Sequence, residues 1–241
     1  MYLCREHFLE DVQRKAREYL RQTGLFAGSS RILIELDGGR NSSALAYILR
    51  NTFHRRRDID LQAVVIAGGA GNAQSFKVAA SVAERLNIPL QHRKMPLALE
   101  DKASSTSASF CKREELSFAA QEMDAGIIAT GEDLDDVALK IFLAYLQGKC
   151  PREAAEVERH WIRPLQRIPK RELRLYALIL DLGSGRTPPS FPNQLHELAR
   201  RQLSEFDHRH PGTNYSLLKG WERLLIPEGG IRAKPLSKDM E

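Results

Sequence analysis

Apolar residues recur along this chain in two alternating spacings. Short and nearly continuous apolar runs, such as ILIEL at 32–36 and LQAVVI at 61–66, are typical of buried strands. Between such runs, as in 42–53 and 73–86, apolar residues recur every three or four positions, which is typical of helices that bury one side. The same alternation predicts further strands at 89–95 and 126–130, and further helices at 112–124 and 133–147.

Strands that alternate with helices predict parallel βαβ units with right-handed crossovers. We therefore expect an α/β fold in which a parallel sheet has helices on both faces. An amphipathic helix is predicted before this core, at 6–22, and further helices are predicted near 169–181, 193–208 and 213–225. These elements divide the chain into an N-terminal helical segment (1–30), a core domain (31–182) and a C-terminal helical segment with a tail (183–241).

Two polar stretches interrupt or end the C-terminal pattern. Residues 183–192 (GSGRTPPSFP) are rich in Gly and Pro and predict a break between helices. The last sixteen residues, IPEGGIRAKPLSKDME, are polar and rich in turn formers, so we expect the tail to be poorly ordered.

Composition limits the class of protein. A chain of 241 residues can bury one full α/β core, and its net charge of +5 with a pI near 9.2 is compatible with a polyanionic partner. Each basic cluster taken alone is equally well explained as a solvated face. No apolar run is long enough to cross a membrane and the N-terminus is charged, so we expect a cytoplasmic protein. Cys4, Cys111 and Cys150 are widely spaced and predict no disulfide framework.

The loop after the first strand is the main candidate for binding. It reads Asp37-Gly38-Gly39-Arg40-Asn41-Ser42-Ser43. Glycines let the backbone approach a ligand closely, and the amides at the start of the following helix favour an anionic oxygen. The loop is therefore a candidate phosphate site, although an ordinary strand-to-helix turn explains the pattern equally well.

A second loop, TGEDLDD at 130–136, also leads from a strand into a helix. Its carboxylates would suit Mg²⁺ beside a bound phosphate, because this ion prefers oxygen ligands. The simpler explanation is that Asp133 or Asp135 caps the helix and the neighbouring acids favour its dipole.

Five segments in the same order resemble the PP-loop ATP-pyrophosphatases, and most closely the cytosolic tRNA 2-thiolation enzymes. DGGRNSSAL at 37–45 stands where that family has SGGKDSSVL, and ATGEDLDDVA at 129–138 where it has ATGHNLDDEA. The other similar segments are YLCREHF (2–8), WIRPLQRIPKRELRLYA (161–177) and HPGTNYSLLKGWERL (210–224). The resemblance implies a HUP-like fold with a five-stranded parallel sheet, and ATP bound at the first loop.

The resemblance also implies a reaction in two steps. ATP adenylates the C2 oxygen of a tRNA pyrimidine and releases pyrophosphate, and sulfur then displaces AMP at that carbon. On this chain the implied nucleotide site comprises 37–43 and Gly131, with Arg40 holding phosphate and Asp135 or Asp136 positioning Mg²⁺. The implied tRNA-binding residues are Lys112 and Arg113, which fall on a pair of family arginines, together with Arg163, Arg167 and Lys170.

The cysteines depart from the family pattern. Without gaps, the family's C-x-x-C falls on Ser105 and Ala108, and the segment GRTPPSFPNQ lacks its later cysteine. A slip of three residues would place Cys111 on the second cysteine, which keeps it as an alternative catalytic thiol. The N-terminal zinc knuckle is also missing. We therefore expect neither zinc nor an iron–sulfur cluster.

The phosphate loop departs as well. Asp37 replaces the family's serine, Arg40 its lysine and Asn41 its aspartate, while Glu132 replaces the histidine of the second loop. A carboxylate about 4 Å from a phosphate oxygen costs about 1 kcal/mol per charge pair in water, and about 4 kcal/mol at a dielectric constant of 20. Asp37 therefore opposes nucleotide binding unless a cation intervenes.

Three functions follow from these patterns. The first is a diverged tRNA 2-thiolation protein with weakened or lost catalysis that works with an active paralogue. The second is an active adenylating enzyme that uses an external nucleophile or a sulfur-carrier protein, similar in chemistry to lysidine synthesis on tRNA. The third is a nucleotide-binding scaffold without RNA. Whether the chain is an enzyme stays open, and the relatives suggest a homodimer or heterodimer.

Overall fold

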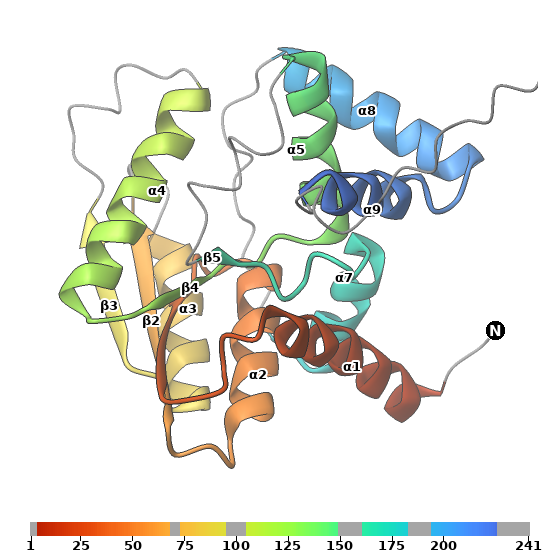
Figure 1. Ribbon diagram of the computed structural model, residues 1–241. Coiled ribbons are helices and arrows are strands. Elements are labelled where there is room, and N and C mark those ends of the chain that lie inside the picture. The colour runs from red at the N-terminus through yellow and green to blue at the C-terminus, as the bar shows by residue number, and fades with distance from the viewer. Residues whose placement is uncertain (1–3, 68–72, 95–104, 149–160, 183–193, 226–241) are drawn as a thin grey trace, which may run out of the picture.

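A computed structural model describes residues 4–67, 73–94, 105–148, 161–182 and 194–225 of the protein. Figure 1 shows a twisted sheet at the left with a bundle of helices at the upper right. The strands are β1 (Ser30–Glu35), β2 (Ile59–Ala67), β3 (Leu90–Lys94), β4 (Ile127–Ala129) and β5 (Trp161–Ile162). The helices are α1 (Arg5–Thr23), α2 (Arg40–Phe53), α3 (Ala73–Leu86), α4 (Ser105–Glu122), α5 (Leu134–Leu146), α7 (Lys170–Ile179), α8 (Gln194–Arg209) and α9 (Thr213–Leu225).

All five strands are parallel, in the order β3-β2-β1-β4-β5. The chain moves outward from β1 to β2 and β3, and α4 then returns it to β4 on the other side of β1. The prediction of a parallel α/β sheet of the HUP-like kind is confirmed. β5 has only two residues, which is too short for any periodicity in the sequence to reveal it.

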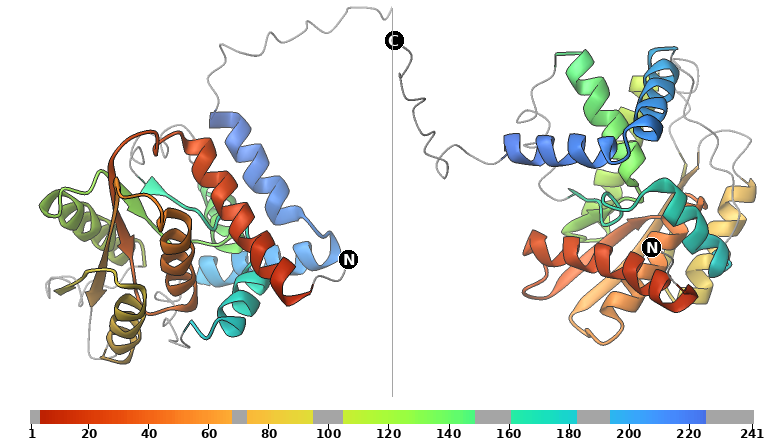
Figure 2. Two further views of the ribbon diagram at one scale, coloured as in Figure 1. Left: turned by 90° about the horizontal axis from the view of Figure 1, so that it is seen from below. Right: turned by 90° about the vertical axis from the view of Figure 1, so that its right-hand side faces the viewer.

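Successive residues of β1 face opposite sides of the sheet and enter two separate cores. Ile32 and Ile34 lie in the larger core, which α1, α2, α3 and α7 cover. Leu33 lies in the smaller core, against Leu116 and Ala119 of α4. The expectation of helices on both faces is therefore confirmed, and the two faces are covered unequally (Figure 2).

The C-terminal helices pack on α5 and only indirectly on the sheet. Leu218 of α9 lies in one apolar cluster with Val137 and Ile141 of α5, and Leu203 of α8 lies in another with Leu139. Since α5 follows the carboxyl end of β4, α8 and α9 are held on that side of the molecule (Figure 1). The sequence predicted these helices, but their spacing does not reveal which helix they contact.

Most predicted element boundaries agree with the structure to within two residues. The exception is α4, which begins at Ser105 and not at 112. Its first two turns, STSASFC, carry few large apolar residues, so the pattern indicated only the later part. The predicted break at 183–192 and the tail lie outside the described residues, and the division into three segments stays a prediction. No helix in the described ranges is long and apolar enough to span a membrane.

Gly38 forms the turn that connects β1 to α2. Its φ is +76°, and a Cβ atom placed there would lie 2.1 Å from the backbone oxygen of Ser75 in α3. The turn therefore requires glycine, both for its left-handed backbone and for the close approach of α3.

We expect Gly38→Ala to lower the free energy of unfolding by roughly 2–4 kcal/mol, because the left-handed strain and the overpacking add. Urea unfolding of the full chain measures this. Gly220→Ala is the matched control: Gly220 lies within α9 with no atom within 4 Å of an added Cβ, so alanine should stabilise by up to about 1 kcal/mol. Equal effects of the two changes would contradict this account of the turn.

Candidate functional site

The two candidate loops lie side by side at the point where the strand order of the sheet reverses, between β1 and β4. β1 and β4 are neighbours, and in sheets of this kind ligands bind at the carboxyl ends of two such strands. Gly131 packs against the start of α2, since a Cβ atom there would lie 3.0 Å from the nitrogen of Ser42. Asn41 donates a hydrogen bond of 2.9 Å from Nδ2 to Oδ2 of Asp133. The loops are therefore joined by close packing and by a hydrogen bond.

Asp37 turns its carboxylate into its own loop. Its Oδ1 accepts hydrogen bonds from the Gly39 amide at 2.8 Å and from the Ser42 hydroxyl at 2.5 Å. The Ser43 hydroxyl donates to the Gly39 carbonyl at 2.9 Å. Asp37 thus occupies two hydrogen-bond donors of the phosphate loop that a phosphate could otherwise use. The first-turn amides of α2 still lack partners within the helix, as in any helix.

Lys112 brings a positive charge to the end of β1. Its ammonium group forms an ion pair with Glu35, and the charge of Glu35 raises the pKa of Lys112 although burial opposes this. Asp37 and Glu132 act on this pKa in the same direction. Lys112 therefore offsets part of the charge of Asp37.

Glu132 is bound by two basic side chains. Its carboxylate oxygens contact Lys140 Nζ at 2.6 Å and Arg163 Nε at 2.8 Å. Burial alone would raise the pKa of Glu132, but these two charges outweigh it and lower the pKa to about 2. Glu132 is therefore an anion at any physiological pH.

Asp133 caps α5 and is fully buried. Its Oδ1 accepts the Asp136 amide at 2.9 Å while Oδ2 accepts the Asn41 bond described above. Burial, followed by the charge of Asp136, raises the pKa of Asp133 to about 7, and Lys170 opposes the shift. The sequence indicated Asp133 only as a helix cap, whereas the fold also connects it to the phosphate loop.

Asp135 and Asp136, the predicted magnesium ligands, contact the start of α7. Asp135 Oδ2 accepts the backbone N–H of Lys170 at 2.8 Å, and Asp136 Oδ1 lies 3.5 Å from Lys170 Nζ. Both carboxylates thus have structural partners on the side of α5 that faces α7. Their role as ligands of Mg²⁺ stays a prediction.

The five basic residues predicted to bind tRNA all have partners within the protein. Arg113 lies over the ring of Trp161, with 4.6 Å from Cζ to the ring centre. Arg167 contacts Glu222 at 3.2 Å and Gln22 at 2.8 Å. Lys112, Arg163 and Lys170 form the ion pairs given above. Contact with RNA through these residues would therefore require changes in existing pairs.

Three other residues bear on the site. Arg40 is exposed at the first position of α2, and its side chain forms no hydrogen bond or ion pair with the described residues. The Thr130 hydroxyl, beside Gly131, is buried without a hydrogen-bond partner among the described residues. Cys111 is buried as a free thiol. Neither Thr130 nor Glu35 was predicted as a site residue, although a charged residue within the apolar run ILIEL was a usable signal for Glu35.

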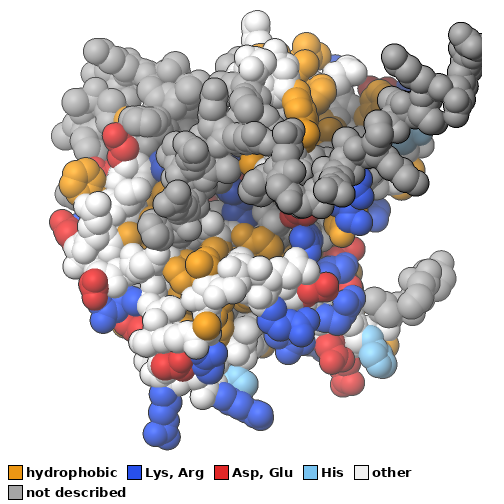
Figure 3. Space-filling view, viewed as in Figure 1, with side chains coloured by type: hydrophobic (Ala, Val, Ile, Leu, Met, Phe, Trp, Pro, Cys, Tyr) orange, Lys and Arg blue, Asp and Glu red, His pale blue; other side chains and the backbone are white. Residues whose placement is uncertain are grey.

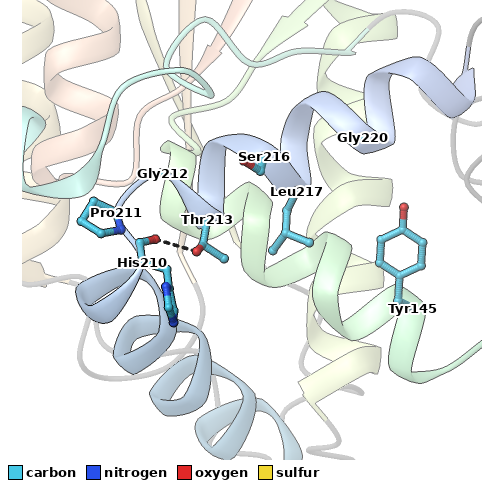
Figure 4. A pocket seen from close by; sticks show the side chains of 8 residues that line it. All are labelled: Tyr145, His210, Pro211, Gly212, Thr213, Ser216, Leu217 and Gly220. Carbon is cyan, nitrogen blue, oxygen red and sulfur yellow. Dashed lines mark hydrogen bonds between the residues drawn. The ribbon is translucent and has the colours of Figure 1, made fainter.

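A separate hollow of about 460 Å³ lies between the end of α5 and the turn from α8 into α9. Figure 4 shows its wall, in which the Thr213 hydroxyl donates a 2.7 Å hydrogen bond to the His210 carbonyl. Apart from His210 and Tyr145, its lining residues carry no titratable side chain. This hollow contains none of the residues predicted for nucleotide chemistry.

A sequence model of the PP-loop domain matches residues 8–183, which is most of the chain. The match spans both loops of the site and the whole sheet. The protein therefore belongs to the PP-loop domain family.

The sequence is similar to those of several tRNA thiolation proteins. The tRNA 2-thiolation protein NcsA of Haloferax volcanii is 24% identical over 92% of this chain and 81% of its own length. The tRNA-5-methyluridine(54) 2-sulfurtransferase of Pyrococcus horikoshii is 25% identical over 95% of this chain and 79% of its own. Among solved structures, the U34-tRNA thiolase NcsA of Methanococcus maripaludis superimposes with a TM-score of 0.84 at 25% identity, over 95% of this chain and 84% of that one.

The expectation that an iron–sulfur cluster is absent is wrong as a conclusion from the sequence. The solved thiolase from Methanococcus maripaludis contains a [4Fe-4S] cluster on the same fold. The expectation relied on cysteine spacing, but a fold can bring cluster ligands together from distant segments. Within the described ranges no three His, Cys, Asp or Glu side chains form a metal-binding group, and Cys150 and the side chains of 105–110 lie outside those ranges.

We expect Asp133 to destabilise the fold as pH rises. Between about pH 4 and pH 7 the folded protein keeps a proton on Asp133 that the unfolded chain has released, so the free energy of unfolding falls with pH. Asp133→Asn keeps the cap but removes this titration. Its stability relative to wild type should be greater at pH 7.5 than at pH 4.5, on the order of 1–3 kcal/mol.

Glu132→Gln is the matched control, because its folded pKa is depressed and its pH dependence has the opposite sign. Its loss of stability should be present at pH 7 and should shrink as pH falls from about 4.5 toward 2. Urea unfolding over a pH series measures both variants. The same pH dependence for both would contradict the assignment.

Proposed function

We propose that this protein is a diverged PP-loop protein of the tRNA 2-thiolation kind, with weakened nucleotide binding, that acts on tRNA in the cytoplasm together with an active partner. Its relatives support the tRNA chemistry. The hydrogen bonds of Asp37 with Gly39 and Ser42 carry the proposal of weakened binding, because they place a negative charge in the phosphate loop.

The site retains part of the machinery that adenylation needs. Gly38 and Gly131 keep the loop compact, and the amides at the start of α2 favour an anionic oxygen. Arg40 is available for phosphate, which a guanidinium can bind through two parallel hydrogen bonds. A bound ATP would supply the adenylyl group that activates the pyrimidine oxygen of the tRNA.

Other parts of that machinery are replaced or otherwise engaged. Asn41 stands in place of a carboxylate that would help to bind Mg²⁺, and it donates to Asp133 instead. Asp135 is bonded to the α7 backbone. A triphosphate would therefore have to displace Asp37 and bind with fewer metal ligands. Displacing Asp37 and binding with fewer metal ligands both weaken nucleotide binding. Neither changes the basic residues predicted to contact RNA.

We expect Asp37→Ser to bind ATP with Mg²⁺ about tenfold more tightly than wild type or better. Removing a carboxylate near the phosphates is worth on the order of 1–4 kcal/mol, depending on solvent exposure. Isothermal titration calorimetry measures the affinities, and Asp37→Ser combined with Asn41→Asp should show a larger gain in the presence of Mg²⁺ than in EDTA.

Asp60→Ser is the control for net charge. Asp60 is the second residue of β2, half-exposed and paired with Arg31 at the opposite end of the sheet, so this variant should bind ATP as wild type does. Wild type binding ATP as tightly as Asp37→Ser would refute the weakened loop.

The protein should bind bulk tRNA, and its affinity should fall linearly on a log–log plot against salt concentration, because basic residues displace counterions from phosphates. Alone it should release no pyrophosphate from ATP in the presence of tRNA. Filter binding across a salt series and a coupled pyrophosphate assay measure these results.

Two outcomes would favour the other candidate functions. Pyrophosphate release by wild type alone would support the active adenylating enzyme, in which Lys112 offsets the charge of Asp37. Absence of tRNA binding at every salt concentration would leave the nucleotide-binding scaffold.

A further inference from the structure

We infer that a second pocket, of about 500 Å³, between α1, the start of α7 and the turn into α9 binds a single unpaired nucleotide of an RNA strand. The inference rests on the proposed function in taking RNA as the partner. Figure 1 shows α7 between α1 and α9 in this region. The wall includes Arg14, Leu134, Pro169, Arg171, Asn214 and Tyr215.

Size and composition separate this pocket from the hollow of Figure 4. A volume of about 500 Å³ falls in the range of roughly 300–1,000 Å³ that small-ligand sites occupy. Leu134 and Pro169 supply an apolar part, while four basic and four acidic side chains make the wall polar. The lining of the other hollow includes no Lys, Arg, Asp or Glu.

Tyr215 supplies an aromatic surface to the pocket. Lys219 Nζ lies 4.9 Å from the centre of its ring, and the residue is 38% exposed. Lys219 thus contacts the ring, and the partly exposed ring lines the pocket, where a flat ligand could stack on it. Proteins that bind single-stranded RNA stack bases on aromatic rings in this way.

Stacking would set the base preference of the pocket. Asn214 lines the wall but is only 5% exposed, and its Oδ1 atom is enclosed by the protein, so it offers a ligand no hydrogen bond. Its backbone N–H donates to Asp207 at 3.2 Å, which holds the start of α9 in place. A purine presents a larger face to an aromatic ring than a pyrimidine does, so adenine should bind more tightly than uracil.

Arg14 and Arg171 supply positive charge at the pocket for a phosphate. Both are exposed, and Arg14 is bound only at surface pairs with Asp11 and, more weakly, Glu18. Arg171 forms no hydrogen bond or ion pair within the described ranges. Lys15 and Arg167, in contrast, are held by Glu172 and Glu222. Basic side chains gather at the lower right of Figure 3, over α1.

The start of α5 connects the pocket to the phosphate loop. Asp135 and Leu134 line the pocket, and both follow Asp133, which bonds to Asn41 of that loop. The first turn of α5 therefore separates the two sites. A strand of RNA that places one nucleotide in the pocket can extend toward the loop.

The test uses fluorescence anisotropy of the full chain with labelled single-stranded hexamers of adenylate and of uridylate at one fixed salt concentration. Wild type should bind the adenylate hexamer more tightly than the uridylate hexamer, and more tightly than a blunt RNA duplex. Tyr215→Ala should weaken adenylate binding roughly 5- to 100-fold, the range for loss of one stacked base. Tyr215→Phe keeps the ring and should bind the adenylate hexamer about as wild type does.

Arg171→Ala and Arg174→Ala form a matched pair. Both arginines are exposed on α7, one turn apart, but only Arg171 lines the pocket, so only its removal should weaken binding severalfold. Equal losses for the pair, or no effect of Tyr215→Ala, would overturn the inference. So would free AMP that competes as effectively as the hexamer, because the ligand would then be a mononucleotide.

The outcome for the pocket is separable from the outcome for the proposed function. ATP binding by Asp37→Ser does not involve Tyr215. A protein that binds the adenylate hexamer through Tyr215 but binds no tRNA would keep the pocket and lose the proposed function. A protein that binds tRNA with no effect of Tyr215→Ala or Arg171→Ala would keep the proposed function and lose the pocket.

Discussion

The contact between Gly131 and the start of α2 is the constraint on which the site depends. It brings two loops together that are separated by about ninety residues, and the lack of a Cβ atom at position 131 lets them approach this closely. The Asn41–Asp133 hydrogen bond closes the same contact. Because β1 and β4 are neighbours, the charged residues that follow these two strands lie close to the phosphate loop.

Charge at the site has been redistributed among residues of the protein. Asp37 accepts donors of its own loop, Lys112 pairs with Glu35, and Glu132 lies between Lys140 and Arg163. Each of these three charges has a partner within the protein, so a ligand that binds one of them must replace an existing interaction. Net affinity for phosphate is then a small difference between competing terms, which is why single substitutions should change it measurably.

The C-terminal helices extend this arrangement on the far side of α5. Asp135 caps α7, and Leu134 packs with Leu218 of α9, so the start of α5 connects the sheet to the helical bundle. The pocket beside Tyr215 results from this packing. Its proximity to the phosphate loop follows from α5, whose first turn takes part in both.

The sequence by itself determined the α/β class, the helices and strands with long periodic patterns, and the two loops that meet at the site. These features are local, because a strand or a helix shows its buried face in the spacing of its own residues. Even a local pattern failed where it was short, as at the two residues of β5 and the first turns of α4. The family resemblance likewise rests on short ordered segments.

Only the tertiary structure decided what each charged residue does. Asp37 follows β1 and Asp135 lies in the first turn of α5, after β4, yet Asp37 faces its own loop while Asp135 accepts from the start of a helix 35 residues away. The five basic residues predicted for RNA all have partners, and the pocket that offers an aromatic ring and two exposed arginines was not visible in any segment. Charge pairs and pockets form between residues far apart in the chain, so their partners depend on how the elements pack, which spacing does not specify.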